Sequence, residues 1–268
     1  MTFKERYGPW ALVAGASEGL GAAYAHALAQ RGLDLLLVAR RARLLSELAA
    51  SLTETTGSQV RCLEGDLSSS EFRDELIAAC SEIDLGLVVY NATHAPVGEF
   101  VSAQLRDLER SIDVNVRAPV YLLHSLLPQL EQRARGGVIL MTSLAGDQGS
   151  PRLAAYAASK AYTRILAESL WHETRDRGVD VIACCSGAVR TPGYLEAAGK
   201  DAPGTLDPEQ VVQRTLRSLG RRPVVIPGVV NRVADIVMAR LLPRRTAIGI
   251  MARSTADLEA SANTPKGD

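Results

Sequence analysis

The sequence predicts an α/β fold, with a doubly wound parallel sheet covered by helices on both faces. Short apolar segments alternate with longer amphipathic segments along the chain, which is the pattern of repeated strand–helix units. The apolar segments lack alternating polar residues, as is typical of parallel strands buried on both faces. The length of 268 residues suits one large domain, and no Pro- and Gly-rich linker divides it.

Seven strands and at least five helices are expected from these segments. The expected strands are Trp10–Ala14, Leu33–Ala39, Val60–Glu64, Leu85–Asn91, Gly137–Ser143, Val179–Cys185 and Pro223–Pro227. The expected helices are Gly19–Gln30, Ala42–Thr55, Ser70–Cys80, Leu105–Leu130 and Ala155–Arg177.

Composition and charge argue against a nucleic-acid-binding, secreted, membrane-spanning or metal-binding protein. The formal net charge is zero, so no basic surface for nucleic acid is expected. Met1–Trp10 has no apolar run that would indicate a signal peptide, and no stretch of about 18 apolar residues indicates a membrane-spanning helix. The four cysteines show no C-x-x-C spacing, and the four histidines are scattered, so no metal site is expected. The expectation is a soluble, cytoplasmic protein.

A glycine cluster directly follows the first expected strand. The segment Gly15-Ala-Ser-Glu-Gly19-Leu-Gly21 then leads into an alanine-rich helix. Glycines at such a turn let backbone N–H groups approach a pyrophosphate at the helix N-terminus. The spacing differs from the commonest dinucleotide fingerprint, and a tight structural turn is the alternative reading. The strand before it and the helix after it favour a nucleotide site.

Basic residues follow the second expected strand. Arg40 and Arg41 stand directly after Ala39, where an NAD site would place an acidic residue for the ribose hydroxyl. An arginine there accommodates the 2′-phosphate of NADP. A solvated start of the next helix is the alternative. The pattern favours NADP(H) as cofactor.

A serine, a tyrosine and a lysine form a candidate catalytic set. Ser143 ends an expected strand, at the edge of the sheet where doubly wound folds bind ligands. Tyr156 and Lys160 are four residues apart and share one face of an expected helix. The Lys160 ammonium would stabilise the Tyr156 phenolate and lower its pKa. A surface helix pair is the alternative, since this spacing alone also occurs by chance.

These motifs together resemble those of the short-chain dehydrogenase/reductase family, over the span from Gly8 to about Pro227. The matching motifs are Gly15, Gly19, Leu20 and Gly21, Asp66-Leu67, Asn91-Ala92, Asn115 within Asp113–Val116, Ser143, Tyr156 and Lys160. The chain departs from the family pattern at Ala14, Glu18, Thr93 and Ser186. The resemblance implies a Rossmann fold and an oxidoreductase.

The resemblance also implies roles for single residues. Asn115 would bend a helix and hold a water for a proton relay. Ser143 would hydrogen-bond the substrate oxygen, Tyr156 would transfer the proton, and Lys160 would bind the nicotinamide ribose. Asp66 would contact the adenine amino group, and Thr191 the nicotinamide carboxamide. The implied cofactor-binding set is Gly15, Ser17, Glu18, Gly19, Leu20, Gly21, Arg40, Arg41, Asp66, Leu67, Asn91, Ala92, Tyr156, Lys160, Gly187, Val189 and Thr191.

The C-terminal part carries the features expected to select the substrate. The catalytic domain is expected over residues 1–256, with a mobile lid over about 188–207 and a disordered tail over 257–268. Asn231–Arg253 combines a helical apolar stripe with several arginines. Such a segment fits an anionic membrane surface, and also a cover for the substrate site or an oligomer contact.

The expected activity is NADPH-dependent reduction of an apolar, lipid-like ketone. A 3-oxoacyl thioester is the first substrate expected, because the C-terminal segment resembles that of bacterial ketoacyl reductases, and this would place the protein in lipid metabolism. An NADP-dependent alcohol or steroid dehydrogenase is the alternative, and a non-catalytic NADP-binding sensor or scaffold is the alternative of another class. A homodimer or homotetramer is also expected.

Overall fold

The computed structural model describes residues 1–198 and 201–262 and contains one seven-stranded sheet. All neighbouring strands are parallel, in the order β3-β2-β1-β4-β5-β6-β7. The strands are β1 Trp10–Ala14, β2 Asp34–Ala39, β3 Val60–Glu64, β4 Leu85–Tyr90, β5 Gly136–Ser143, β6 Val179–Ser186 and β7 Val224–Val225. The strand order reverses between β1 and β4, and open α/β sheets bind ligands at the carboxyl ends beside such a reversal.

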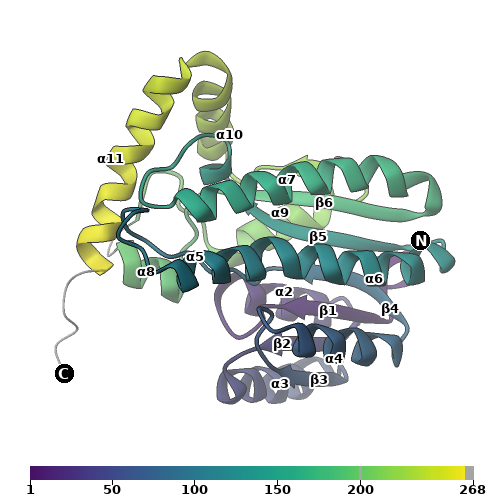
Figure 1. Ribbon diagram of the computed structural model, residues 1–268. Helices are drawn as coiled ribbons and strands as arrows, with labels where there is room; N and C mark the ends of the chain where they lie inside the picture. The colour runs from purple at the N-terminus through teal and green to yellow at the C-terminus, as the bar shows by residue number, and fades with distance from the viewer. Residues whose placement is uncertain (199–200, 263–268) are drawn as a thin grey trace.

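Helices cover both faces of the sheet (Figure 1). They are α1 Phe3–Tyr7, α2 Gly19–Ala29, α3 Ala42–Thr56, α4 Ser70–Ser81, α5 Leu105–Ile112, α6 Ala118–Gln132, α7 Ala154–Thr174, α8 Pro192–Ala198, α9 Pro208–Ser218, α10 Val229–Ile236 and α11 Arg244–Ala262. Four short turns complete the helical elements: η1 Asp113–Arg117, η2 Leu144–Gly146, η3 Arg175–Arg177 and η4 Val237–Leu241.

Two apolar clusters hold these layers together. One packs α2, α3 and α9 on the sheet around Tyr24, Leu52 and Val212, and the other packs α4, α6 and α7 on the opposite face around Leu76 and Leu122. Both clusters draw on the strands, whose side chains alternate between the faces. The predicted fold class, a doubly wound parallel sheet with helices on both faces, is confirmed.

The expected elements differ from the observed ones in a few places. All seven strands are present; β1 and β3 have the expected bounds, and the ends of the other five shift by at most two residues. The expected helix Leu105–Leu130 is interrupted by the π-helical turn Asp113–Arg117. The expected lid contains a short helix, Pro192–Ala198, and residues 199 and 200 within it lie outside the described residues. The mobility of the lid stays a prediction.

The C-terminal segment corrects two expectations. Asn231–Arg253 is not one continuous helix, because Pro243, which cannot donate a backbone hydrogen bond, separates η4 from α11. Residues 257–262 belong to α11 rather than to a disordered tail, and 263–268 lie outside the described residues. The elements α10, η4 and α11 form a hairpin at the carboxyl edge of the sheet, with α11 against α8 (Figure 1). Within the described chain, no helix is long and apolar enough to cross a membrane.

Candidate active site

A cavity of about 750 Å³ opens at the carboxyl ends of the central strands. Its walls come from the glycine turn after β1, the end of β2, and the segments that follow β3, β4, β5 and β6. Residues from α7, α8 and α11 close the remaining side. The volume lies within the roughly 300–1,000 Å³ typical of small-molecule sites.

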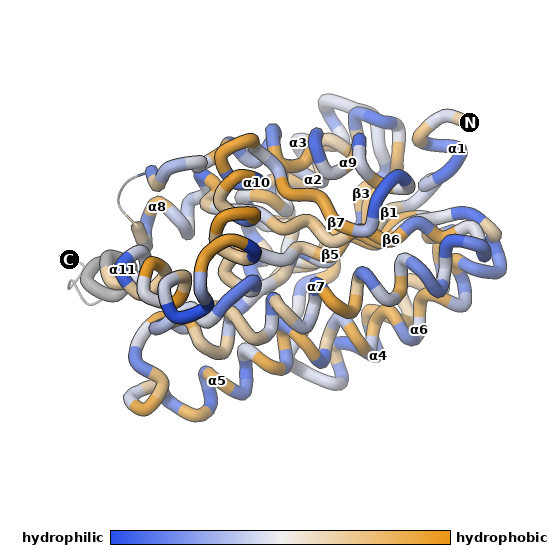
Figure 2. The backbone as a smooth tube through the Cα atoms, turned by 90° about the horizontal axis from the view of Figure 1, so that it is seen from above, coloured by the Kyte–Doolittle hydropathy of each residue, from blue (hydrophilic) through white to orange (hydrophobic). Residues whose placement is uncertain are grey.

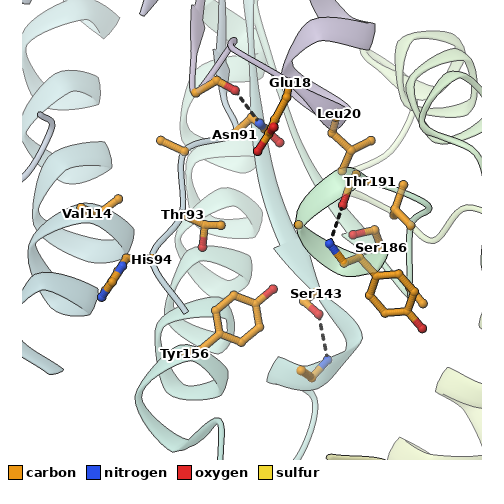
Figure 3. Close-up of a pocket in the computed structure, with 18 of the residues that line it drawn as sticks. Glu18, Leu20, Asn91, Thr93, His94, Val114, Ser143, Tyr156, Ser186 and Thr191 are labelled. Carbon is orange, nitrogen blue, oxygen red and sulfur yellow. Dashed lines mark hydrogen bonds between the residues drawn. The ribbon is translucent and has the colours of Figure 1, made fainter. Parts of the chain in front are cut away.

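Ser143 and Tyr156 meet on the wall of this cavity. Ser143 is the last residue of β5, and its Oγ accepts a hydrogen bond from the Ala145 N–H at 3.2 Å, so its own hydroxyl hydrogen can point elsewhere. Tyr156 lies in the first turn of α7 with its hydroxyl turned toward Ser143 (Figure 3). Burial raises the pKa of Tyr156, and the neighbouring Ser143 hydroxyl lowers it in part. The phenol is therefore protonated at neutral pH and can donate a proton.

Lys160 lies behind Tyr156, one helical turn further along α7. Its Nζ is 5.5 Å from the centre of the Tyr156 ring and donates to the Met141 carbonyl at 2.9 Å. Burial lowers the pKa of Lys160 to about 8. Burial is the largest influence on the pKa of Tyr156 and raises it, so the expected lowering by Lys160 stays a prediction.

Asn115 ties the segment after β4 to α7. Its Oδ1 accepts from the His94 N–H at 2.8 Å, and its Nδ2 donates to the His94 carbonyl at 2.8 Å and to Ser159 Oγ at 3.0 Å. It lies in the π-helical turn η1, a type of turn at which helices often kink, and the expected bend stays a prediction. Asn115 is buried behind the cavity wall rather than on it. Its role in a proton relay stays a prediction.

The glycine turn has the shape of a cradle for an anionic group. Gly15 and Gly19 have φ angles of 84° and 56°, and residues other than glycine rarely adopt such positive values. A Cβ on Gly15 would lie 2.6 Å from the Ala92 nitrogen, and one on Gly21 would lie 1.9 Å from the Gly15 carbonyl oxygen. Gly21 is thus a packing residue and does not line the cavity, although it was expected to bind the cofactor. Glu18 is the N-cap residue of α2, and within the described chain its side chain accepts no hydrogen bond from the helix. The N–H groups of the first turn of α2 are therefore suited to bind a pyrophosphate.

Arg40 and Arg41, both on the cavity wall, differ in their partners. Arg41 forms an ion pair with Glu18 at 2.7 Å and donates to Ser17 Oγ at 2.9 Å, so it neutralises the acid between the glycines. Arg40 has no ion-pair partner within the part of the chain that the structure describes. Its charge contributes to lowering the pKa of Asp66. The free guanidinium of Arg40 is the better candidate for a 2′-phosphate.

Asp66 already has partners in the protein. It pairs with Arg110 and accepts from the Ser68 N–H at 3.0 Å. Burial alone would raise the pKa of Asp66, but the hydrogen bonds from Ser68 and the charges of Arg110 and Arg40 lower it. Asp66 and Leu67 do line the cavity, as expected. Arg110 also lines it and was missed, because no sequence spacing links α5 to the end of β3.

The cavity wall combines predicted and unexpected residues. It includes seven further residues that were expected to bind the cofactor: Ser17, Leu20, Asn91, Ala92, Gly187, Val189 and Thr191. Met251 and Ser254 of α11 also line the cavity, and neither was predicted as a site residue. The same helix is held by Thr255, whose hydroxyl donates to the Pro151 carbonyl at 2.8 Å. The C-terminal hairpin therefore contributes to the wall of the cavity, and its expected role as a cover for the substrate site stays a prediction.

The chain is similar to a known protein family and to several known proteins. A family model described as short chain dehydrogenase matches residues 9–200. A 7beta-hydroxysteroid dehydrogenase of Clostridium sardiniense is 35% identical over 235 residues, which is 87% of this chain and 90% of that protein. A very-long-chain 3-oxoacyl-CoA reductase of Laccaria bicolor is 31% identical over 183 residues, which is 67% of this chain and 54% of that protein.

Two solved structures share the whole architecture. A structure from a study of 7beta-hydroxysteroid dehydrogenase stereoselectivity has a TM-score of 0.89 and 28% identity, and the match covers 94% of this chain and 99% of that one. A short-chain dehydrogenase from Sphingobium yanoikuyae, in complex with NADPH, has a TM-score of 0.76 and 28% identity, and the match covers 97% and 98%.

Proposed function

This chain belongs to the short chain dehydrogenase family and is an oxidoreductase acting on hydroxyl or carbonyl groups; on that premise we propose that it is an NADP(H)-dependent hydroxysteroid dehydrogenase. The hydroxyls of Ser143 and Tyr156, which lie close together on the cavity wall, carry the proposal, because they supply the two groups that a reacting oxygen needs.

The proposed mechanism follows from the positions of these side chains. When bound in the cavity, the nicotinamide cofactor would supply or accept the hydride. During reduction, the substrate oxygen gains negative charge, and the Ser143 hydroxyl stabilises it by donating a hydrogen bond. Tyr156 gives its proton to the same oxygen, and Lys160 places a positive charge behind the ring at 5.5 Å. During oxidation, the same groups act in reverse.

The steroid-like substrate is supported by the cavity and by the relatives. Leu153, Tyr194 and Met251 give the substrate side an apolar lining, as a fused-ring ketone requires. The 7beta-hydroxysteroid dehydrogenase from Clostridium sardiniense matches almost the full length of this chain, whereas the 3-oxoacyl-CoA reductase matches a shorter part of both proteins. The 3-oxoacyl thioester expected from the sequence is therefore the second candidate.

A substrate panel is expected to separate these candidates. The purified protein would be assayed by loss of NADPH absorbance on a 7-ketosteroid, a 17-ketosteroid and a 3-oxoacyl-CoA of long chain length. We expect the highest kcat/KM on the 7-ketosteroid, because the cavity wall suits a rigid apolar ring system and relatives that match most of this chain are 7beta-hydroxysteroid dehydrogenases. A higher kcat/KM on the 3-oxoacyl-CoA would replace the steroid assignment with the thioester one.

The preference for NADPH over NADH is expected to depend on Arg40. Arg40→Asp removes the unpaired guanidinium and adds a negative charge, so NADPH affinity should fall by roughly 10- to 100-fold while NADH affinity is kept. A fluorescence titration of each cofactor measures this. Arg43→Asp is the matched control, because Arg43 is exposed, pairs with Glu47 and does not line the cavity. Equal loss of NADPH affinity in both variants would contradict the role of Arg40.

A further inference from the structure

The helix α10 is fixed in its rotation by two polar side chains one turn apart. Asn231 is 4% exposed, and its Nδ2 donates to the carbonyls of Pro227 at 3.0 Å and Gly204 at 3.1 Å. Asp235 points inward as well and lies 3.9 Å from Arg164, which also pairs with Asp147. Because Asn231 and Asp235 face the protein, the opposite side of α10 faces solvent.

The solvent side of this segment is apolar with a basic border. We call it the α10 surface: it comprises Val229, Val233, Ile236 and Leu241, with Arg232 and Arg240 beside them. The four apolar side chains are between 48% and 70% exposed. Both arginines are exposed, and the one acidic residue of the sequence between 229 and 256 is the inward-facing Asp235. In Figure 2 the backbone tube of α10 includes a stretch coloured orange for hydrophobic residues.

We propose that the α10 surface docks on an anionic lipid bilayer. Burial of exposed aliphatic side chains in the acyl boundary is favourable, and arginines at the rim are attracted to anionic headgroups. Charge complementarity selects this occupant. A second copy that paired through the same face would bring arginines against arginines, with no exposed acid on the surface to oppose them.

The α10 surface is connected to the cavity wall, so docking on a bilayer would affect access of substrate to the cavity. The hairpin that carries the α10 surface continues into α11, whose Met251 and Ser254 line the cavity. Arg244, at the start of α11, donates to the Asp147 carbonyl at 2.6 Å, so the hairpin is tied to the segment that follows Ser143. Docking would hold the wall of the substrate site against the bilayer, where apolar substrates partition. The proposal does not depend on the steroid assignment.

Vesicle flotation tests the docking directly. The full chain would be mixed with vesicles of phosphatidylcholine alone, or of phosphatidylcholine with phosphatidylglycerol, at low and high salt. We expect the protein to float with the anionic vesicles at low salt and to be released by high salt, because headgroup attraction is screened. Arg232→Gln/Arg240→Gln should lower partitioning by roughly 30-fold, from two lost contacts with the anionic surface.

Matched variants keep this test interpretable. Arg43→Gln/Arg175→Gln removes the same charge from exposed arginines that belong to other elements and should leave flotation unchanged. Val233→Ser/Ile236→Ser should weaken flotation, whereas Val101→Ser, at an 89% exposed valine, should not. Cofactor titration and light scattering check that each variant is folded and report its oligomeric state.

Three outcomes would overturn the proposal. They are an absence of flotation with anionic vesicles, an equal effect of the α10 and control variants, and a wild-type oligomer that dissociates in Arg232→Gln/Arg240→Gln. The last result would assign the surface to a second copy of the chain instead.

Discussion

Replacing Tyr156 with phenylalanine is expected to lower turnover by roughly 10²- to 10⁴-fold, with fold and cofactor affinity kept. The substitution deletes one hydroxyl and leaves the ring that packs in front of Lys160. Hydride transfer to a carbonyl leaves negative charge on oxygen, which needs a proton donor within hydrogen-bond reach. Ser143 remains as a hydrogen-bond donor in this variant but is too weak an acid to be the main proton source.

The measurement is kcat on a verified substrate, with cofactor affinity determined separately by titration. Tyr162→Phe is the matched control, because Tyr162 lies on the same helix and its side chain is 44% exposed. That variant should keep wild-type turnover. A folded Tyr156→Phe enzyme with near wild-type kcat would show that Tyr156 is not the proton donor.

The sequence predicted the parts of the site that short-range spacing determines. Ser143 ends a strand, Tyr156 and Lys160 share a helix face, and the glycines follow the first strand, so their positions depend on local periodicity and on the sheet edge. The alternation of apolar and amphipathic segments predicted the sheet and its two helical layers for the same reason. Parallel topology then brings residues far apart in the chain to one edge.

Contacts between distant elements could not be predicted in this way. Arg110 reaches Asp66 only because α5 packs beside the end of β3 in three dimensions. Met251 enters the cavity wall because the chain folds back at Pro243. The burial of Tyr156 and Lys160 could not be predicted either, since the spacing places the amine near the ring but does not reveal how strongly both groups are buried.

Gly21→Ala is expected to destabilise the fold and weaken cofactor binding together. A Cβ at this position would lie 1.9 Å from the Gly15 carbonyl oxygen, which is backbone and cannot rotate away. The first turn of α2 would have to move away from the glycine turn. Overpacking of this kind lowers the free energy of unfolding by about 1–3 kcal/mol, and a clash with backbone can lower it further. The same displacement would pull the N–H groups of that turn out of register with a pyrophosphate.

Urea unfolding and an NADPH titration measure the two effects of Gly21→Ala. Gly249→Ala is the matched control, because a Cβ on Gly249 in α11 meets no atom within 4 Å among the described residues. Alanine there should raise the free energy of unfolding by about 0.5–1 kcal/mol, through a smaller loss of backbone entropy in the helix. If Gly21→Ala unfolds at the wild-type urea concentration and binds NADPH as tightly as the wild type, the close approach of α2 to Gly15 does not determine the conformation of the glycine turn. Opposite shifts in the two alanine variants would show that contact with the Gly15 carbonyl, rather than glycine replacement itself, sets the cost.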